Sequence, residues 1–287
     1  MTEVLFGLDV TTSAAPGVDP VGIALRAESL GFDFVSASDH PSSGHPTLET
    51  WTLLSWIAAT TTRIRVATRV LGVPNRPPPV LAKMAETLDR MSGGRLILGL
   101  GGGASDEEFR AFGLRVPTPR DKVDGLEEAI LITRGLWTEP SFTFDGRLYR
   151  TDAAELEPKP SRRIPIWLGT FGPRALELTG RLADGWIPSL ELAPPERVPA
   201  MQERIFRGAE EANRNPEDIT LAYNLEIRID ERADTPHHVV SGTPGAVAEQ
   251  LVGFTRLGFS AMNFQPQGPG RDEQIERLAT EVIPAVR

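Results

Sequence analysis

The sequence predicts an α/β fold, a (β/α)8 barrel of the TIM type, formed by residues 1–287 as a single domain. Eight short apolar segments alternate with helical patterns from one end of the chain to the other, which is typical of βα units on a parallel sheet. The length suits a barrel of about 250 residues with insertions, and no low-complexity linker divides the chain. The alternative is an open doubly wound sheet, for which eight βα units would be many.

Several of the expected strands are rich in Val, Ile and Phe, as parallel strands buried on both faces should be. In chain order, the strands are Val4–Val10, Phe32–Ala37, Ile64–Leu71, Arg95–Leu100, Pro165–Gly169, Gly185–Pro188, Ile219–Ile229 and Ala261–Gln265. The carboxyl ends of parallel barrel strands meet at one face, and functional sites of barrels lie there. The residues that follow each strand are therefore the candidates for function.

The helices expected between these strands have recognisable ends. Asp19-Pro20 opens one helix as its N-cap and first-turn proline, and Gly31 closes it. Thr243-Pro244 opens another helix in the same way. The segments Pro78–Met91 and Arg120–Trp137 carry apolar residues at the spacing of one helical face.

Two segments interrupt the alternation and are interpreted as insertions, one after the fourth strand and one before the fifth. They span Ala104–Pro119 and Glu139–Arg163. Within the second, Phe142–Tyr149 predicts a β-hairpin around Asp145-Gly146, because Asp-Gly is favoured in two-residue hairpin loops.

The composition excludes several classes of function. With 30 basic and 39 acidic residues, the formal net charge is -9, so we expect neither nucleic acid nor a membrane as a partner. There is no cysteine, and the four histidines lack a metal-ligand spacing such as HExxH, so no metal site is expected. No basic and apolar signal segment and no run of about 18 apolar residues is present, which predicts a cytoplasmic protein.

Selecting the residues at the carboxyl ends of the expected strands yields a small set of candidate site residues. They are Asp9, Ser38–His40, Arg69–Leu71, Gly99–Gly103, Gly169–Pro173, Ser189, Glu226 and Gln265. The tryptophans fall mostly within expected helices or strands, and we assign them to packing. They are Trp51, Trp56, Trp137, Trp167 and Trp186.

Several motifs follow one another in a specific order along the chain. They are Glu28–Asp33 leading to Ser38-Asp39-His40, then Thr62–Leu71, Pro79–Gly101, Ile166–Leu176, Ala183–Ile187 and Gly242-Thr243-Pro244. With these motifs, nearly the whole chain resembles the bacterial-luciferase-like flavin enzymes, especially their coenzyme F420-dependent branch. The resemblance implies a barrel oxidoreductase that binds a flavin-type cofactor at the strand ends and commonly forms a homodimer.

Asp39 and His40 are the candidate catalytic residues. An imidazole with a carboxylate nearby, at the carboxyl end of a strand, can transfer protons near neutral pH. The alternative is that Asp39 caps the following turn while His40 packs beside Pro41. The resemblance supports catalysis, because it implies a histidine that lies against the flavin ring and acts on the substrate.

The glycine run after the fourth strand allows a ligand to approach the backbone closely. It supplies three candidate cofactor-binding residues, Gly101, Gly102 and Gly103. A nicotinamide-binding Rossmann motif is rejected, because the run leads into Asp106-Glu107-Glu108 instead of the helix and distant acidic residue that the motif requires. Some F420-dependent sugar-phosphate dehydrogenases carry a glutamate directly after this loop as a proposed proton donor, whereas this chain has Ala104-Ser105.

A second candidate cofactor site is the turn that precedes the helix after the fifth strand. Pro173 lies in the first turn of that helix, so backbone N–H groups at the helix N-terminus are free for an anion. We expect a cofactor phosphate at this turn, and the alternative is an ordinary strand–helix connection with Arg174 in solvent. The candidate residues are Gly169, Thr170, Phe171, Gly172 and Arg174.

Arg69, Val70 and Leu71 close the third strand and complete the candidate cofactor site. The resemblance implies a bulge here with a non-proline cis peptide that supports the flavin from behind, and Arg69–Val70 is the candidate bond. A plain strand end is the alternative. Arg69, Arg76 and Arg174 are available for the acidic tail of F420, although arginines this common are often simply solvated.

Together these features predict an oxidoreductase that transfers a hydride between F420 and a small organic substrate, with the protein supplying orientation and proton chemistry. The alternative within the family is an FMN-dependent, oxygen-using monooxygenase. A barrel hydrolase or isomerase that uses Asp39, His40 and Glu226, or a flavin-binding protein without catalysis, stays open. The identity of the substrate depends on the two insertions and on the shape of the pocket.

Overall fold

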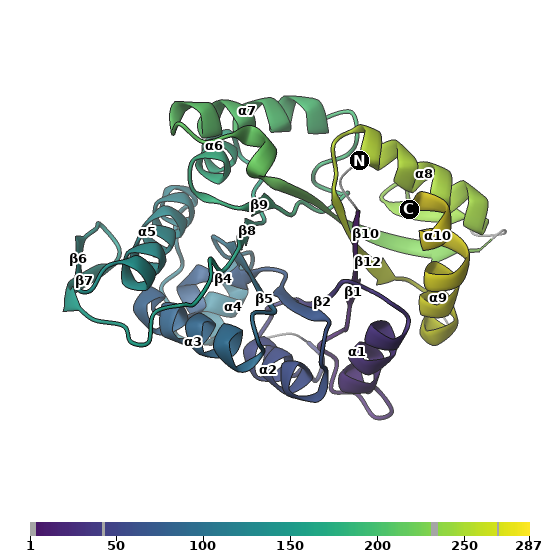
Figure 1. Ribbon diagram of the computed structural model, residues 1–287, viewed down its shortest axis with the longest axis horizontal. Coiled ribbons are helices and arrows are strands. Elements are labelled where there is room, and N and C mark those ends of the chain that lie inside the picture. Colours follow the sequence, from purple (N-terminus) through teal and green to yellow (C-terminus); the bar gives the residue numbers. More distant parts are fainter. Residues whose placement is uncertain (1–3, 42–43, 231–234, 269) are drawn as a thin grey trace.

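The computed structural model describes residues 4–41, 44–230, 235–268 and 270–287, which fold into a barrel of parallel strands surrounded by helices (Figure 1). The strands of the wall follow the order β1-β2-β3-β5-β8-β9-β10-β12. β12 pairs with β1, and β9 pairs with β10, so the sheet closes on itself. The predicted (β/α)8 barrel is therefore confirmed, and the alternative of an open sheet is wrong.

Each strand of the wall coincides, within a few residues, with one predicted segment. These strands are β1 (Leu5–Asp9), β2 (Phe34–Ala37), β3 (Arg65–Thr68), β5 (Leu96–Gly101), β8 (Ile166–Leu168), β9 (Gly185–Trp186), β10 (Thr220–Ile229) and β12 (Ala261–Pro266). Two further strands are present: β4 (Leu71–Gly72), which begins at the last residue of the predicted third strand, pairs with β5, and β11 (Val239–Gly242), which was not predicted, pairs with β10. The predicted strand Ile64–Leu71 is thus divided into β3 and β4, and the Arg69–Val70 bond between them is cis.

Helices connect the strands and form an outer ring around the barrel (Figure 1). They are α1 (Pro20–Ser29), α2 (Thr50–Thr60), α3 (Pro78–Met91), α5 (Pro119–Thr138), α6 (Pro173–Leu182), α7 (Val198–Glu211) and α8 (Pro244–Arg256). The chain ends in α9 (Arg271–Arg277), a π-helical segment (Leu278–Val282) and α10 (Ile283–Val286), and short 3-10 turns lie at Val73–Asn75 and Pro216–Asp218. The predicted N-caps are present: Asp19 accepts a hydrogen bond from the N–H of Gly22, and Thr243 accepts one from Ala246.

Both predicted insertions are present. The first contains α4 (Asp106–Ala111), and the second contains the hairpin of β6 (Phe142–Asp145) and β7 (Arg150–Ala154), which projects beside α5 (Figure 1). The predicted hairpin is displaced, because its turn runs over residues 146–149 instead of Asp145-Gly146. The carboxylate of Glu128 in α5 accepts hydrogen bonds from the backbone N–H groups of residues 147, 148 and 149, so a distant residue holds this turn.

The interior of the barrel changes character along the strands. Its lower layer is a buried apolar cluster of Phe34, Ala67, Ile97, Trp167, Ile187, Ala222 and Ala261. Side chains two positions apart on a strand share a face, and two residues further along most strands the inward positions are small or polar. These positions include Gly7, Ser36, Gly99, Gly169, Ser189, Asn224 and Asn263. The apolar core therefore ends below the carboxyl ends of the strands.

Candidate active site

A cavity of about 390 Å³ opens at the carboxyl ends of the strands, the face that barrel architecture assigns to function. Below, it is called the mouth cavity. Its wall combines apolar side chains and glycine backbone with a few polar groups, as small-molecule sites usually do. The lining residues are Asp39, His40, Arg69, Val70, Leu71, Gly72, Asn75, Gly101, Gly102, Gly103, Ala104, Glu108, Phe109, Gly169, Phe171, Ile187, Ser189, Leu192 and Asn224.

Three predicted cofactor residues, from the turn before α6 and the first turn of that helix, do not line the mouth cavity. Thr170 is buried with its hydroxyl 2.7 Å from that of Thr179, and Arg174 forms an ion pair with Asp124 of α5. Gly172 is exposed, and apart from its chain neighbours no atom lies within 4 Å of where a Cβ would be. The binding of a phosphate at this turn stays a prediction, and it would take place beside the cavity.

His40 lies at the rim of the mouth cavity, with about half of its side chain exposed. Its Nδ1 is 3.0 Å from Oε1 of Glu108. Glu108 is held in the first turn of α4, where its N–H donates to the hydroxyl of the N-cap Ser105. An imidazole engaged through Nδ1 presents Nε2 on the opposite side of the ring, which suits it to exchange a proton with a bound molecule.

Asp39 has a different role from the one expected of a partner for His40. Its buried carboxylate accepts hydrogen bonds from the N–H of Gly72, the amide of Asn75 and both terminal nitrogens of Arg76, at 2.9–3.2 Å. Burial disfavours the charged guanidinium, but the hydrogen bonds to Asp39 and Glu49 outweigh it and raise the pKa of Arg76. The carboxylate beside His40 is that of Glu108, and Asp39 instead ties the end of β2 to the segment before α3.

The pairing of Arg76 also corrects its expected availability for an acidic cofactor tail, because both of its terminal nitrogens are engaged by carboxylates. Glu108 was not among the candidate site residues predicted from the sequence. The acidic segment that contains it, Asp106-Glu107-Glu108, was used only as an argument against a Rossmann motif. A usable signal was present: Ser105 and Glu108 have the spacing of a helix start that faces the mouth of the barrel.

Protein neighbours, Val70 among them, occupy the space beside the glycines of this region. A Cβ on Gly101 would lie 2.8 Å from Cγ2 of Val70, and one on Gly169 would lie 3.1 Å from the same atom. On Gly99, a Cβ would come within 1.9 Å of the Thr68 carbonyl oxygen. The glycine run was expected to leave space for a ligand. Side chains are excluded at these positions first by the neighbouring protein atoms, and the glycine backbone still lines the cavity.

Arg69 brings positive charge to the inner wall of the cavity. One of its terminal nitrogens donates to Oδ1 of Asp9 at 3.0 Å, and Arg271 lies 3.6 Å from the other oxygen of that carboxylate. Within the described residues, the buried Nε of Arg69 has no hydrogen-bond acceptor. Two guanidinium groups around one carboxylate leave an excess of positive charge and an unused donor below the mouth.

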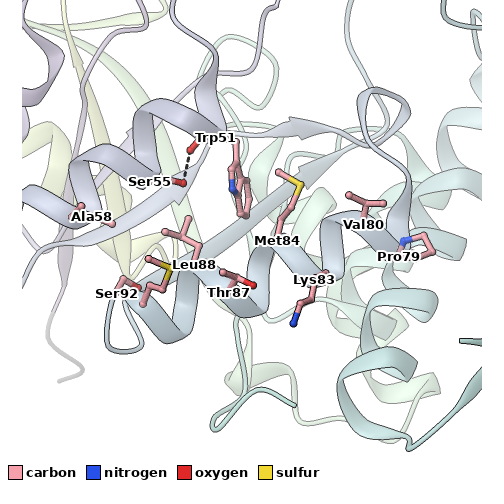
Figure 2. Close-up of a pocket in the computed structure, with 12 residues that line it drawn as sticks. Trp51, Ser55, Ala58, Pro79, Val80, Lys83, Met84, Thr87, Leu88 and Ser92 are labelled. Carbon is pink, nitrogen blue, oxygen red and sulfur yellow. Dashed lines mark hydrogen bonds between the residues drawn. The ribbon is translucent and has the colours of Figure 1, made fainter. Parts of the chain in front are cut away.

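A larger hollow, of about 560 Å³, lies on the outside of the barrel between α2 and α3 and is called the outer groove below. Figure 2 shows the side chains of Trp51 and Met84 between the two helices, with the amino group of Lys83 turned away. Trp56 is 65% exposed and Met91 is 82% exposed on the same two helices. The assignment of Trp56 to packing is therefore wrong for the isolated chain, because its helix turns it outward.

The described residues contain neither a metal-binding cluster nor a membrane-spanning helix. Within them, no group of three or more His, Cys, Asp or Glu side chains is arranged to hold a metal ion. Over the same residues, no helix combines the length and the apolar character needed to cross a bilayer.

Comparison with known proteins places this architecture. Residues 5–238 match the family described as luciferase-like monooxygenase. An F420-dependent glucose-6-phosphate dehydrogenase from Nakamurella multipartita is 32% identical over 234 residues, which cover 79% of this chain and 68% of that protein. The structure of an F420-dependent secondary alcohol dehydrogenase in complex with an F420-acetone adduct superposes with a TM-score of 0.90, at 21% identity and 99% coverage of both chains. The structure of a monooxygenase from Streptomyces bottropensis superposes with a TM-score of 0.83, at 21% identity over 99% of this chain and all of that one. The two structural comparisons show that the fold is shared.

Proposed function

Because the chain belongs to the luciferase-like monooxygenase family, we propose that it is an oxidoreductase that transfers a hydride between F420 and a small organic substrate. Residues 1–287 would act as a single domain. The observation that carries the proposal is the mouth cavity, which joins the His40–Glu108 pair to an apolar and glycine-lined wall. Relatives such as the Nakamurella protein bear names of F420-dependent dehydrogenases, which supports the choice of cofactor.

The residues of the mouth cavity fit a flat ring with a polar edge. Its volume is within the range of about 300–1,000 Å³ that is usual for small-molecule sites. Val70, Phe171 and Ile187 offer apolar contact, and the unused Nε of Arg69 offers a buried donor. When bound, F420 supplies two-electron hydride transfer, and its reduced form reacts poorly with oxygen.

His40 supplies the proton chemistry that accompanies the hydride. When a hydroxyl-bearing carbon loses a hydride, its oxygen loses a proton, and Nε2 of His40 is the group to accept that proton. Glu108 holds the ring through Nδ1 and stabilises the imidazolium that forms. In the reverse direction, the same nitrogen returns the proton to the carbonyl oxygen as the carbon receives a hydride.

We further propose that Glu108 compensates for the missing glutamate after the glycine run. The position directly after the run is Ala104, which lines the cavity but has no ionisable group that could exchange a proton. Glu108 stands one helical turn further on and approaches the same cavity from α4.

Titration of the purified protein with F420 and, separately, with FMN tests the proposal. We expect F420 to bind more tightly, as followed by its fluorescence, and turnover to consume no oxygen in an oxygen-electrode measurement. Tighter binding of FMN together with oxygen uptake would overturn the choice of cofactor and favour the monooxygenase. Binding of neither cofactor would overturn the proposed function.

We also propose that the chain forms a homodimer through the outer groove. α2 carries no charged residue in its eleven positions, although it lies on the outer surface of the barrel. Protein interfaces are depleted of charge and enriched in Trp and Met at their centres, and Trp56 and Met91 flank the groove. A twofold interface needs one patch that is complementary to itself, and a patch with both a groove and protruding apolar side chains meets that need.

A further inference from the structure

A chain of polar side chains crosses the barrel directly below the mouth cavity. It joins Ser36 of β2, Asn263 of β12 and Asn224 of β10, all of which are buried. The hydroxyl of Ser36 donates to Oδ1 of Asn263 at 2.9 Å, and Nδ2 of Asn263 donates to Oδ1 of Asn224 at 2.8 Å. Buried amides are stable only when they are hydrogen-bonded, so each link restrains the next.

The barrel itself does not require this polar chain. Ala222 and Ala261, two positions earlier on the same strands as the two asparagines, pack in the apolar cluster below. Apolar residues could continue that core upward without any need for hydrogen-bond partners. The polar side chains begin instead where the core meets the cavity, which points to a role towards the cavity.

The direction of the hydrogen bonds determines how the amide of Asn224 is turned. An asparagine amide has one acceptor oxygen and one NH2 donor group. Because Oδ1 of Asn224 accepts from Asn263 inside the barrel, its Nδ2 is the atom left to face the mouth cavity, which Asn224 lines. The hydrogen bonds of the described residues give this Nδ2 no protein acceptor.

The backbone of Asn224 is fixed as well. Its N–H donates to the carbonyl oxygen of Pro188 at 2.9 Å, and its own carbonyl accepts from the N–H of Leu190 at 3.1 Å. With the backbone held in this way and Oδ1 engaged by Asn263, the amide is restrained in the orientation described above. A donor held in this way is preorganised for an acceptor of matching position.

We propose that Nδ2 of Asn224 donates a hydrogen bond to a carbonyl or hydroxyl oxygen of the molecule bound in the mouth cavity, and that Asn263 and Ser36 are positioning residues for it. The proposal rests on the proposed function, because F420 and its substrate are the two molecules that would bring such an oxygen there. The shared chemistry is a neutral oxygen acceptor, and the experiment separates the two sources.

The test compares Asn224→Asp and Asn224→Ala with the wild-type protein. Aspartate keeps an oxygen towards Asn263 but replaces the donor at the cavity by a second oxygen, so donation becomes repulsion. Alanine only removes the donor. We expect a graded loss, about threefold for Ala and about tenfold or more for Asp, the size expected for one lost and then one opposed hydrogen bond.

Two measurements identify the source of the acceptor. If the oxygen belongs to F420, the Kd from F420 fluorescence rises in this graded order. If it belongs to the substrate, the F420 Kd is unchanged while KM rises in the same order. Ser36→Ala, at the far end of the chain, is expected to move the same parameter by about twofold to threefold.

Asn213→Asp is the matched control, because Asn213 is exposed on the outside of the barrel after α7. It should leave both parameters unchanged. Thermal melting verifies that each variant folds, and Asn224→Ala carries the test if Asn224→Asp does not fold. A wild-type protein that binds F420, with unchanged Kd and KM in the folded Asn224 variants, would overturn this proposal alone. A wild-type protein that binds neither F420 nor FMN would overturn the proposed function and this proposal with it.

Discussion

The mouth cavity and the outer groove differ more in the chemistry of the side chains that line them than in their size. The outer groove is the larger of the two, about 560 Å³ against about 390 Å³. Lys83 is the one charged residue in the described lining of the groove, and its amino group is turned to the carbonyl of Glu157. The mouth cavity holds the His40–Glu108 pair and the guanidinium of Arg69. Volume alone would therefore favour the outer groove, whereas the chemistry of the walls supports the mouth cavity as the proposed active site and the outer groove as the proposed interface.

A second pair of outer helices shows what the outer groove lacks. α6 and α7 pack closely, because a Cβ on Gly180 would lie 1.9 Å from the carbonyl oxygen of Ile205. Glu177 of α6 forms ion pairs with Arg204 and Arg207 of α7 across their exposed edge. The outer edge of the α6–α7 pair is formed by these charged side chains, which suits it to contact with water. By contrast, α2 and α3 leave apolar side chains exposed, which is typical of a surface that a partner covers.

The largest expected effect tests the mouth cavity as the site of chemistry. His40→Ala should lower kcat by 10² or more, because a positioned acid or base contributes about 10²–10⁴ to turnover. The Kd for F420 should stay within about tenfold, since the apolar and glycine-lined wall remains. Steady-state kinetics and F420 fluorescence titration measure the two quantities. His237→Ala, which alters an exposed histidine, is the control and should keep full activity; full activity of folded His40→Ala would end the assignment.

The next effect tests the outer groove as a dimer interface. Met91→Glu places a charge on an apolar face that we expect to be buried between two copies. The dimer dissociation constant should rise by at least about 30-fold, the equivalent of about 2 kcal/mol at an interface hot spot. Sedimentation velocity across a concentration series measures it, and F420 binding should not change.

Ala200→Glu adds the same charge to α7, where Ala200 is exposed on the opposite side of the ring of helices (Figure 1). This control should leave the dimer intact. If the wild-type chain sediments as a monomer at all concentrations, the proposed dimer interface at the outer groove is wrong. Equal weakening by both variants would show that net charge, instead of the groove, controls association.

The barrel and most of the mouth cavity could be predicted from the sequence, because both depend on local patterns. Each strand is a short apolar segment, and parallel strands bring their ends together, so the pattern alone assigns His40 and Gly101 to one face of the barrel. Asn224 was missed because only strand ends were selected, whereas β10 continues beyond the level of the cavity to Ile229. A polar residue within the apolar run Leu221–Leu225 was the available signal.

Other features depend on contacts that the local sequence does not contain. The partner of His40 comes from the insertion after β5, whose path decides where Glu108 lies. The hairpin turn is held by Glu128, about twenty residues earlier in the chain, which overrides the preference of Asp145-Gly146. The exposure of Trp56 was missed because α2 has no charged residue that marks its outer face, so its pattern does not distinguish the buried face from the outer one.

A smaller effect tests whether Glu108 acts through charge. Glu108→Gln keeps an oxygen that can accept from Nδ1 of His40 but removes the negative charge that stabilises the imidazolium. We expect kcat to fall by about tenfold, because partial exposure of His40 screens the charge. Glu107→Gln alters an exposed neighbour on the same helix and should have no effect. An unchanged kcat in Glu108→Gln would assign catalysis to His40 without its carboxylate partner.

The smallest expected effect tests whether the mouth site extends beyond its cavity to the N-terminus of α6. Gly172→Glu places a carboxylate where the helix dipole and free N–H groups would attract a cofactor phosphate. The Kd for F420 should rise by about fivefold, which corresponds to the loss of about 1 kcal/mol of helix-terminus attraction. Thermal stability without cofactor should change little, because apart from the chain neighbours no atom lies within 4 Å of the new Cβ. Gly245→Glu is the matched control, since Gly245 is equally open in the first turn of α8. The turn before α6 contributes Gly169 and Phe171 to the described lining of the mouth cavity, whereas α8 and the turn before it contribute no residue. If both variants bind F420 as tightly as the wild type, the phosphate lies elsewhere, and the cavity alone accounts for cofactor binding. If only Gly172→Glu binds F420 more weakly, the cofactor site consists of the mouth cavity for the ring and a separate helix N-terminus for the phosphate.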